Sequence, residues 1–242
     1  MGILEIRKEL AAICANELYS GLTDVVVPEP YIPYIPENWN GVLVVAEAQN
    51  ITEKSYSNYS KNQKIVRLYP NKDLSQNYEV SGPFPELDVK PWEDGTIPLA
   101  LKAALDLNPW ECAVGNACFW SRRCGNANEN PNDEMKNQSK DLWLKMWPLL
   151  GEHITKVVCC GKIAWSIMDF VGDGKKLELK HSSRRILNPI SDMLSEEDLF
   201  KFYPAVKKAY DELGFDKSNL SYKRNAVFYA CHAVSWLKGF WI

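Results

Sequence analysis

The sequence predicts an α/β protein in which helices cover both faces of a parallel β-sheet. Three short segments are apolar almost throughout, as is typical of strands buried on both faces: 41–46, 113–120 and 156–161. Between them, apolar side chains recur at helical spacing, as in 96–107 and 133–152. Buried strands that alternate with helices indicate a parallel sheet with helices on both sides.

The first hundred residues add a helix, a strap and a long irregular segment. Residues 3–19 have helical spacing, and Ser20-Gly21 ends the predicted helix. Residues 28–39 contain four prolines and are expected to form an extended strap across the surface. From 50 to about 95 there is little periodicity, so we expect an irregular insertion; a segment of that length without regular structure usually carries function.

The remainder of the chain continues the same alternation. Thr96 is the expected N-cap of the helix over 96–107. The other expected elements are a polar loop at 121–132, a helix at 162–170, a strand at 177–180 that ends at His181, and C-terminal helices at about 193–213 and 222–239. No internal repeat or linker interrupts the pattern, so a single domain over residues 1–242 is expected.

Composition narrows the class of protein. Hydrophobic residues make up 46% and charged residues 24% of the 242 residues, which is ordinary for a soluble globular protein. The net charge of −3 provides no overall field that attracts nucleic acid, so a polyanion would have to meet a local basic patch. Seven cysteines without a CxxC pair, no signal peptide and no long apolar stretch indicate a soluble, cytoplasmic protein without membrane contact.

Polar side chains follow two of the predicted strands. Glu47 lies at the end of the first apolar segment, and His181, followed by Arg184 and Arg185, lies at the end of the fourth strand. In a parallel sheet these strand ends meet at one edge, where α/β proteins bind ligands. This edge is the best lead to function.

Several segments resemble the motifs of one known family in order and spacing. Residues 46–50 (Ala-Glu-Ala-Gln-Asn) resemble its Gly-Glu-Ala-Pro-Gly turn, and Asn116 matches its pyrimidine-reading asparagine. Residues 156–164 resemble its third-strand segment, and 181–183 its His-Pro-Ser motif. Over roughly residues 10–190 the chain therefore resembles the uracil-DNA glycosylase superfamily, most closely its thermophilic iron–sulfur branch. This resemblance implies a three-layer α/β/α sandwich with a central four-stranded parallel sheet.

The resemblance also implies an active site at the strand ends. Glu47 would stabilise positive charge on the sugar or orient the attacking water, and His181 would donate a hydrogen bond to the uracil O2. Asn116 offers both a donor and an acceptor, which match O4 and N3–H of uracil. The other base-binding positions are Ala48, Gln49, Asn50 and a stacking ring at Tyr59, with Tyr56 as the second candidate for that ring.

Enzymes of this kind act on a base that has been flipped out of the DNA stack. The loop that fills the vacated space in such relatives corresponds to residues 184–187. The implied DNA-binding residues are Ser182, Ser183, Arg184, Arg185 and Leu187. Lys175, Lys176, Lys180, Arg122 and Arg123 would extend a local basic strip for phosphates.

Two departures from the family pattern affect cofactor and catalysis. Four cysteines hold the cluster in the iron–sulfur branch, but here the matching positions hold Cys14, Glu17, Trp120 and Trp143. We therefore expect no iron–sulfur cluster, no metal and no other cofactor. In addition, Ala48 occupies the turn position at which the most active relatives use Asp or Asn to position water.

Three functions remain open from the sequence. The first is a DNA glycosylase that removes uracil or a related deaminated base, with DNA as its partner. The second is a superfamily member that binds a nucleobase or nucleic acid without catalysis, and the third is a hydrolase or transferase of a small nucleotide. Each residue also has a structural alternative: Glu47 as a helix cap, Asn116 as a bond to the next strand, Tyr59 as loop packing.

Overall fold

The computed structural model describes residues 1–19, 30, 32–48, 95–120, 122–124, 127–181, 195–213 and 223–238. The chain divides into two compact units, and each is described by itself. The first unit comprises residues 1–91 and 111–178, and the second comprises 92–110 and 179–242. The single domain expected from the sequence stays a prediction.

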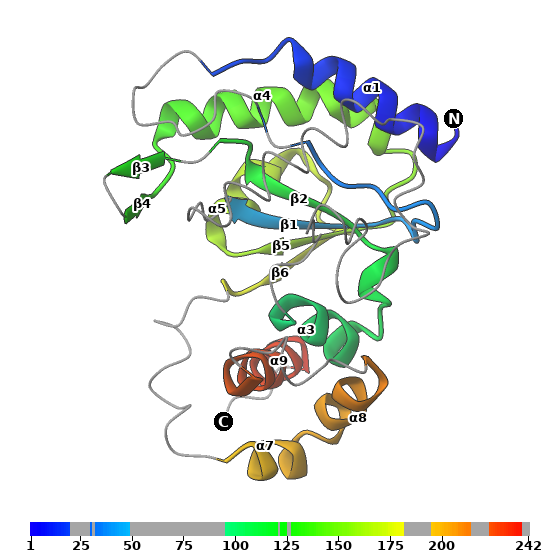
Figure 1. The fold of residues 1–242 in the computed structure, drawn as a ribbon, viewed down its shortest axis with the longest axis vertical. Helices are drawn as coiled ribbons and strands as arrows, with labels where there is room; N and C mark the ends of the chain where they lie inside the picture. The colour runs from blue at the N-terminus through cyan, green and yellow to red at the C-terminus, as the bar shows by residue number, and fades with distance from the viewer. Residues whose placement is uncertain are drawn as a thin grey trace, which may run out of the picture. The chain divides into compact units, whose positions relative to one another are not determined.

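A four-stranded sheet with the order β2-β1-β5-β6 forms the centre of the first unit (Figure 1). Its strands are β1 (Val42–Ala48), β2 (Ala113–Cys118), β5 (Lys156–Cys160) and β6 (Lys176–Leu179). All four run parallel, and Val44 of β1 pairs with Val114 on one side and Val158 on the other. The predicted α/β class and four-stranded parallel sheet are confirmed, and the arrangement is consistent with a three-layer α/β/α sandwich.

The helices of the first unit pack against this sheet through an apolar core. They are α1 (Ile3–Ala15), α4 (Asp133–Leu150) and α5 (Lys162–Ile167), with a 3-10 turn, η3, at Met168–Phe170. Helices α1 and α4 lie side by side along the sheet (Figure 1). The core joins side chains from these helices to alternate residues of the strands: Ile6, Leu10, Trp143, Met146, Leu43, Val45, Val157 and Cys159. Alternate strand residues belong to one core because neighbouring side chains of a strand point to opposite faces.

Residues 32–36 of the strap expected on the surface are buried instead, whereas Glu37 and Asn38 are exposed. Ile32, Tyr34 and Ile35 are at most 4% exposed, and Tyr34 forms an isolated antiparallel bridge with Val114 of β2. The Tyr34 N–H donates to the Val114 oxygen at 2.7 Å, and the Val114 N–H donates back at 2.9 Å. These bonds occupy backbone groups that the edge strand β2 would otherwise leave open. The prolines of the strap therefore shape a segment that covers the sheet edge.

Two further expectations are corrected in the first unit and at the start of α3. The predicted polar loop at 121–132 contains two short antiparallel strands, β3 (Arg122–Cys124) and β4 (Ala127–Glu129). Thr96 is the first residue of α3 (Thr96–Leu105) and not its N-cap, because Gly95 occupies that position without a side-chain bond. Strands of three residues carry too little alternation to stand out in a sequence.

The second unit contains α3 and the C-terminal helices. Where one helix was expected at 193–213 there are two, α7 (Glu196–Phe202) and α8 (Pro204–Leu213), and α9 follows at Lys223–Lys238. Helix α7 begins with a capping box in which Ser195 and Asp198 satisfy each other's backbone N–H. Tyr203 separates α7 from α8 with φ −124° and ψ 73°, as the residue before a proline is driven out of the helical region.

The expected insertion at 50–95 lies almost entirely outside the described residues. Within the part of the chain that the structure describes, every helix is too short or too polar to span a bilayer.

Candidate functional site

Glu47 lies at the carboxyl end of β1, as the sequence predicts, but still within the strand. It is the penultimate residue of β1 and is half-buried. Ala48, expected in a turn, is the last strand residue and pairs with Cys118 of β2. The chain therefore turns only after Ala48, and the next two candidates, Gln49 and Asn50, lie outside the described residues.

Asn116 lies near the carboxyl end of β2 and is 6% exposed. Its backbone pairs with Ala46 of β1, so it sits on the strand next to the one that carries Glu47. No hydrogen bond joins its side-chain amide to another residue in the described ranges. Neither polar atom of the amide is fully buried without a partner, so its donor and acceptor at this edge are available to a ligand.

Glu47 and Asn116 leave the sheet on opposite faces. Ala46 and Asn116 are register partners and point to the same side. Glu47 follows Ala46 directly, so its side chain points to the other side. A single ligand can touch both groups only where it crosses the end of the two strands.

Helix α4 fixes the strand end that carries Asn116. The indole N–H of Trp143 donates to the backbone oxygens of Asn116 at 3.3 Å and Ala117 at 3.2 Å. The buried Ser139 hydroxyl accepts the Phe119 N–H at 3.2 Å. Gly115 permits this close approach, since a Cβ there would lie 3.1 Å from the Trp143 ring. Three contacts therefore position the end of β2 against α4.

Burial and the carboxylate of Glu47 both raise the pKa of the Cys118 thiol at this strand end. Cys118 is 1% exposed, and burial raises its pKa to about 12, with a smaller contribution from the carboxylate of Glu47. A thiol with such a pKa is protonated at neutral pH and is a poor nucleophile or metal ligand. Burial likewise raises the pKa of Cys159 and Cys231 to about 12. These cysteines act as small core residues, as the sequence predicts.

His181 belongs to the second unit, just beyond β6, and is half-buried. The segment that leads to it is held by α9. The Tyr229 hydroxyl donates to the Lys180 backbone oxygen at 2.8 Å, and the Lys180 ammonium lies 4.8 Å from the centre of the Trp236 ring. In the sheet, β5 separates β6 from β1. The strand that carries Glu47, β1, and the strand that precedes His181, β6, are therefore not neighbours.

Part of the predicted DNA-binding strip contacts the protein itself. The Lys175 ammonium donates to the Ile154 backbone oxygen at 2.8 Å, just beyond the end of α4, where a cation complements the helix dipole. The Lys176 ammonium lies 4.0 Å from the centre of the Trp165 ring. The other predicted contacts lie outside the described residues, namely Ser182, Ser183, Arg184, Arg185 and Leu187, as do the candidate stacking rings Tyr59 and Tyr56.

The positions that match cluster ligands in the iron–sulfur branch are occupied by core contacts and an ion pair. The Cys14 sulfur lies 3.9 Å from the Met146 sulfur, and Glu17 pairs with Lys145. Trp120 packs on Tyr19 and Trp143 on Phe119, with ring centres 5.1 Å and 5.0 Å apart. Within the described ranges no three His, Cys, Asp or Glu side chains are grouped so as to hold a metal ion. The expected absence of a cofactor stays a prediction.

Two residues that position the site, Ser139 and Trp143, are not recognisable from the sequence. Ser139 and Trp143 lie at helical spacing on the buried side of α4, and nothing in that spacing indicates which backbone groups they bind. Only the tertiary packing of α4 on β2 brings them to the strand end.

Comparison of the chain with models of known protein families and with curated proteins gives no match.

Proposed function

We propose that the protein is a DNA glycosylase that removes uracil or a related deaminated base by hydrolysing its N-glycosidic bond. The support comes from the strand order β2-β1-β5-β6, which makes the strands of Glu47 and Asn116 direct neighbours. Both residues lie near the carboxyl edge of a parallel sheet, the usual ligand-binding edge of such folds, with their side chains on opposite faces.

The observation that carries the proposal is the side-chain amide of Asn116. The residue as a whole is 6% exposed, and its amide forms no hydrogen bond with another described residue. Neither polar atom of this amide is fully buried without a partner, so the amide stays within reach of a ligand. A uracil edge would supply partners for both, because its O4 accepts a hydrogen bond and its N3–H donates one.

Glu47 and His181 would act on the two charges that develop in the reaction. In hydrolysis the bond between C1′ of the sugar and the base breaks, and the base departs with the bonding electrons. Water adds its oxygen to C1′ and loses one proton, which neutralises the departed base. Glu47 stabilises the positive sugar or orients the water, and His181 donates a hydrogen bond to the base as its negative charge grows. Because Glu47 and Asn116 point to opposite faces, the nucleotide crosses the strand ends with its base on the Asn116 side.

The test is a single-turnover assay on labelled oligonucleotides that carry one uracil, in single-stranded, U·G and U·A contexts. The wild-type protein is compared with Glu47→Gln, His181→Ala and Asn116→Ala. We expect base release by the wild type and a loss of about 10²-fold or more in each variant, since each removes a group that acts on the developing charge or holds the base. No release by the wild type in any context would refute catalysis.

Two controls separate function from folding. Glu129→Gln makes the same chemical change at an exposed glutamate of β4, and its rate should equal that of the wild type. Asn116→Ala should unfold at nearly the same denaturant concentration as the wild type, because the amide it removes forms no bond with another described residue. If Asn116→Ala is instead destabilised by more than about 1 kcal/mol, the amide is a structural group and the proposal loses its main support.

One observation favours a second candidate, a recognition module that binds a base or nucleic acid without cleaving it. Ala48 brings only a methyl group to the end of β1, still paired with Cys118, and a methyl group cannot hold a water molecule. The same assay distinguishes the two candidates: binding of the uracil oligonucleotide in a gel shift with zero base release would assign the protein to this second class.

A further inference from the structure

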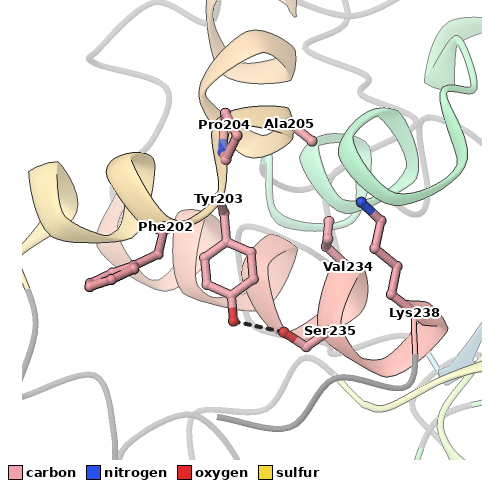
Figure 2. Close-up of a pocket in the computed structure, with 7 residues that line it drawn as sticks. All are labelled: Phe202, Tyr203, Pro204, Ala205, Val234, Ser235 and Lys238. Carbon is pink, nitrogen blue, oxygen red and sulfur yellow. Dashed lines mark hydrogen bonds between the residues drawn. The ribbon is translucent and has the colours of Figure 1, made fainter.

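The second unit contains a pocket of about 350 Å³ that the proposed glycosylase chemistry does not use. It lies between the junction of α7 with α8 and the C-terminal part of α9 (Figure 2). Its lining residues are Phe202, Tyr203, Pro204, Ala205, Val234, Ser235 and Lys238. The volume is at the lower end for sites that bind small molecules. A pocket of this size accommodates a small ligand.

The break between α7 and α8 creates this pocket. Tyr203 leaves the helical conformation before Pro204, and its ring projects from the junction toward α9 (Figure 2). Phe202, which also lines the pocket, is 62% exposed. The rings of Tyr203 and Pro204 and the side chain of Val234 together form an apolar wall.

The polar groups of the pocket offer donors and no negative charge. The Tyr203 and Ser235 hydroxyls are 2.7 Å apart, and either one can be the donor. One hydroxyl proton satisfies this bond, so the pair retains a second proton for another acceptor. Lys238 lies in the last turn of α9, is exposed and forms no ion pair with another described residue. No acidic side chain is among the described residues that line the pocket.

We propose that this pocket binds a small aromatic monocarboxylate. The aromatic body packs against the Tyr203, Pro204 and Val234 wall, and the carboxylate accepts hydrogen bonds from the Lys238 ammonium and from the remaining hydroxyl proton. A carboxylate fits better than a neutral group, because a charge-assisted hydrogen bond is about twice as strong as a neutral one. Helix α8 begins at Pro204, so the positive end of its dipole adds to the attraction.

The experiment measures binding of 3-phenylpropionate to the full chain by calorimetry and by shifts of backbone amide resonances. Its neutral counterpart, 3-phenylpropanol, has the same body without the charge. We expect the carboxylate to bind at least about tenfold more tightly than the alcohol, and to shift the amides of residues 202–205 and 234–238.

Substitutions test the assigned groups. Lys238→Met keeps the length of the side chain but removes its charge, and should weaken binding of the carboxylate by about tenfold without affecting the alcohol. Lys208→Met, at an exposed lysine of α8 outside the pocket, is the matched control and should bind as the wild type does. Ser235→Ala, which leaves both helices intact, should weaken binding of the carboxylate to a smaller extent.

Two results would overturn the inference. The first is no binding of 3-phenylpropionate to the wild type at millimolar concentration. The second is equal affinity of the wild type and Lys238→Met for 3-phenylpropionate, with both proteins shown by thermal unfolding to be folded. The inference is independent of the proposed glycosylase, since neither Glu47 nor Asn116 lines the pocket.

Discussion

The ionisation of His232 shows how a single side chain ties this protein's stability to pH. His232 lies on α9 within the second unit and is half-buried. Burial lowers its pKa below 6.5, and the nearby Lys180 ammonium lowers it further. Both effects act in the same direction, because each disfavours the charged imidazolium. The native protein therefore resists protonation of this side chain.

A pH-dependent loss of stability follows from this lowered pKa. Between the native pKa of His232 and about 6.5, the unfolded chain binds more protons than the native protein, so the free energy of unfolding falls as pH decreases. The loss begins near pH 6.5 and is complete below the native pKa. Urea unfolding at pH 7.5 and 5.5 should show a smaller difference for His232→Gln than for the wild type. Parallel pH profiles of the two proteins would show that His232 does not contribute.

Sequence and structure agree best on the elements that are buried on both faces. The strands at 41–46 and 156–161 were predicted to within two residues of β1 and β5, because continuous apolar segments have few other interpretations. The strap was wrongly expected on the surface, since prolines are common there and only the bridge of Tyr34 to Val114 reveals its role. The periodicity of a sequence predicts the structure of single segments and does not predict a pairing between distant segments, such as that of Tyr34 with Val114.

The sequence predicts which strands carry the site residues, but not the directions in which their side chains point. The alternation of strands and helices predicts Glu47 and Asn116 at strand ends, but only the observed order β2-β1-β5-β6 makes their two strands neighbours. Their projection from opposite faces depends on the register of Ala46 with Asn116, which the sequence does not encode locally. Likewise, Lys175 was expected at a phosphate, whereas its ammonium reaches a backbone oxygen near the end of α4.

Helix α4 makes a testable contribution to the strand end. Trp143 is fully buried, and its indole N–H is shared by the backbone oxygens of Asn116 and Ala117. Trp143→Phe removes this donor and opens a small cavity, so we expect a loss of about 2–4 kcal/mol in the free energy of unfolding. Denaturant unfolding measures it. Trp147→Phe is the control on the same helix, because the Trp147 indole is only half-buried and its N–H forms no hydrogen bond with another described residue.

The expected loss for Trp147→Phe is smaller than that for Trp143→Phe. Trp147 packs edge-on against Phe170 with ring centres 5.1 Å apart, and a phenylalanine retains part of that contact. Equal losses in the two variants would mean that the hydrogen bonds of Trp143 to β2 contribute nothing to the free energy of unfolding beyond what packing contributes.

At the scale of the whole molecule, net charge decides how a nucleic acid is bound. The chain carries −3, so the DNA of the proposed function would be attracted by a few local cations and not by the protein's overall field. Lys175 and Lys176 contact a backbone oxygen and a ring of the protein, which reduces the number of cations available for phosphates. Arg122 likewise donates to the Asn130 backbone oxygen at 3.1 Å. The remaining basic candidates of the strip are few, chiefly Arg123, Arg184 and Arg185. The electrostatic part of DNA binding should therefore be modest.

The salt dependence of DNA binding measures how many cations of the protein contact phosphates. The logarithm of the association constant for double-stranded DNA falls with the logarithm of salt concentration by about 0.9 for each neutralised phosphate. With about three cations in contact we expect a slope near −3, and near −1 when Arg184 and Arg185 are both replaced by Gln. Fluorescence anisotropy with a labelled uracil duplex at several salt concentrations gives both slopes, and Lys8→Gln with Lys207→Gln serves as a control that removes equal charge elsewhere. A slope near zero in the wild type would contradict DNA as the partner, because a small nucleotide displaces few counterions.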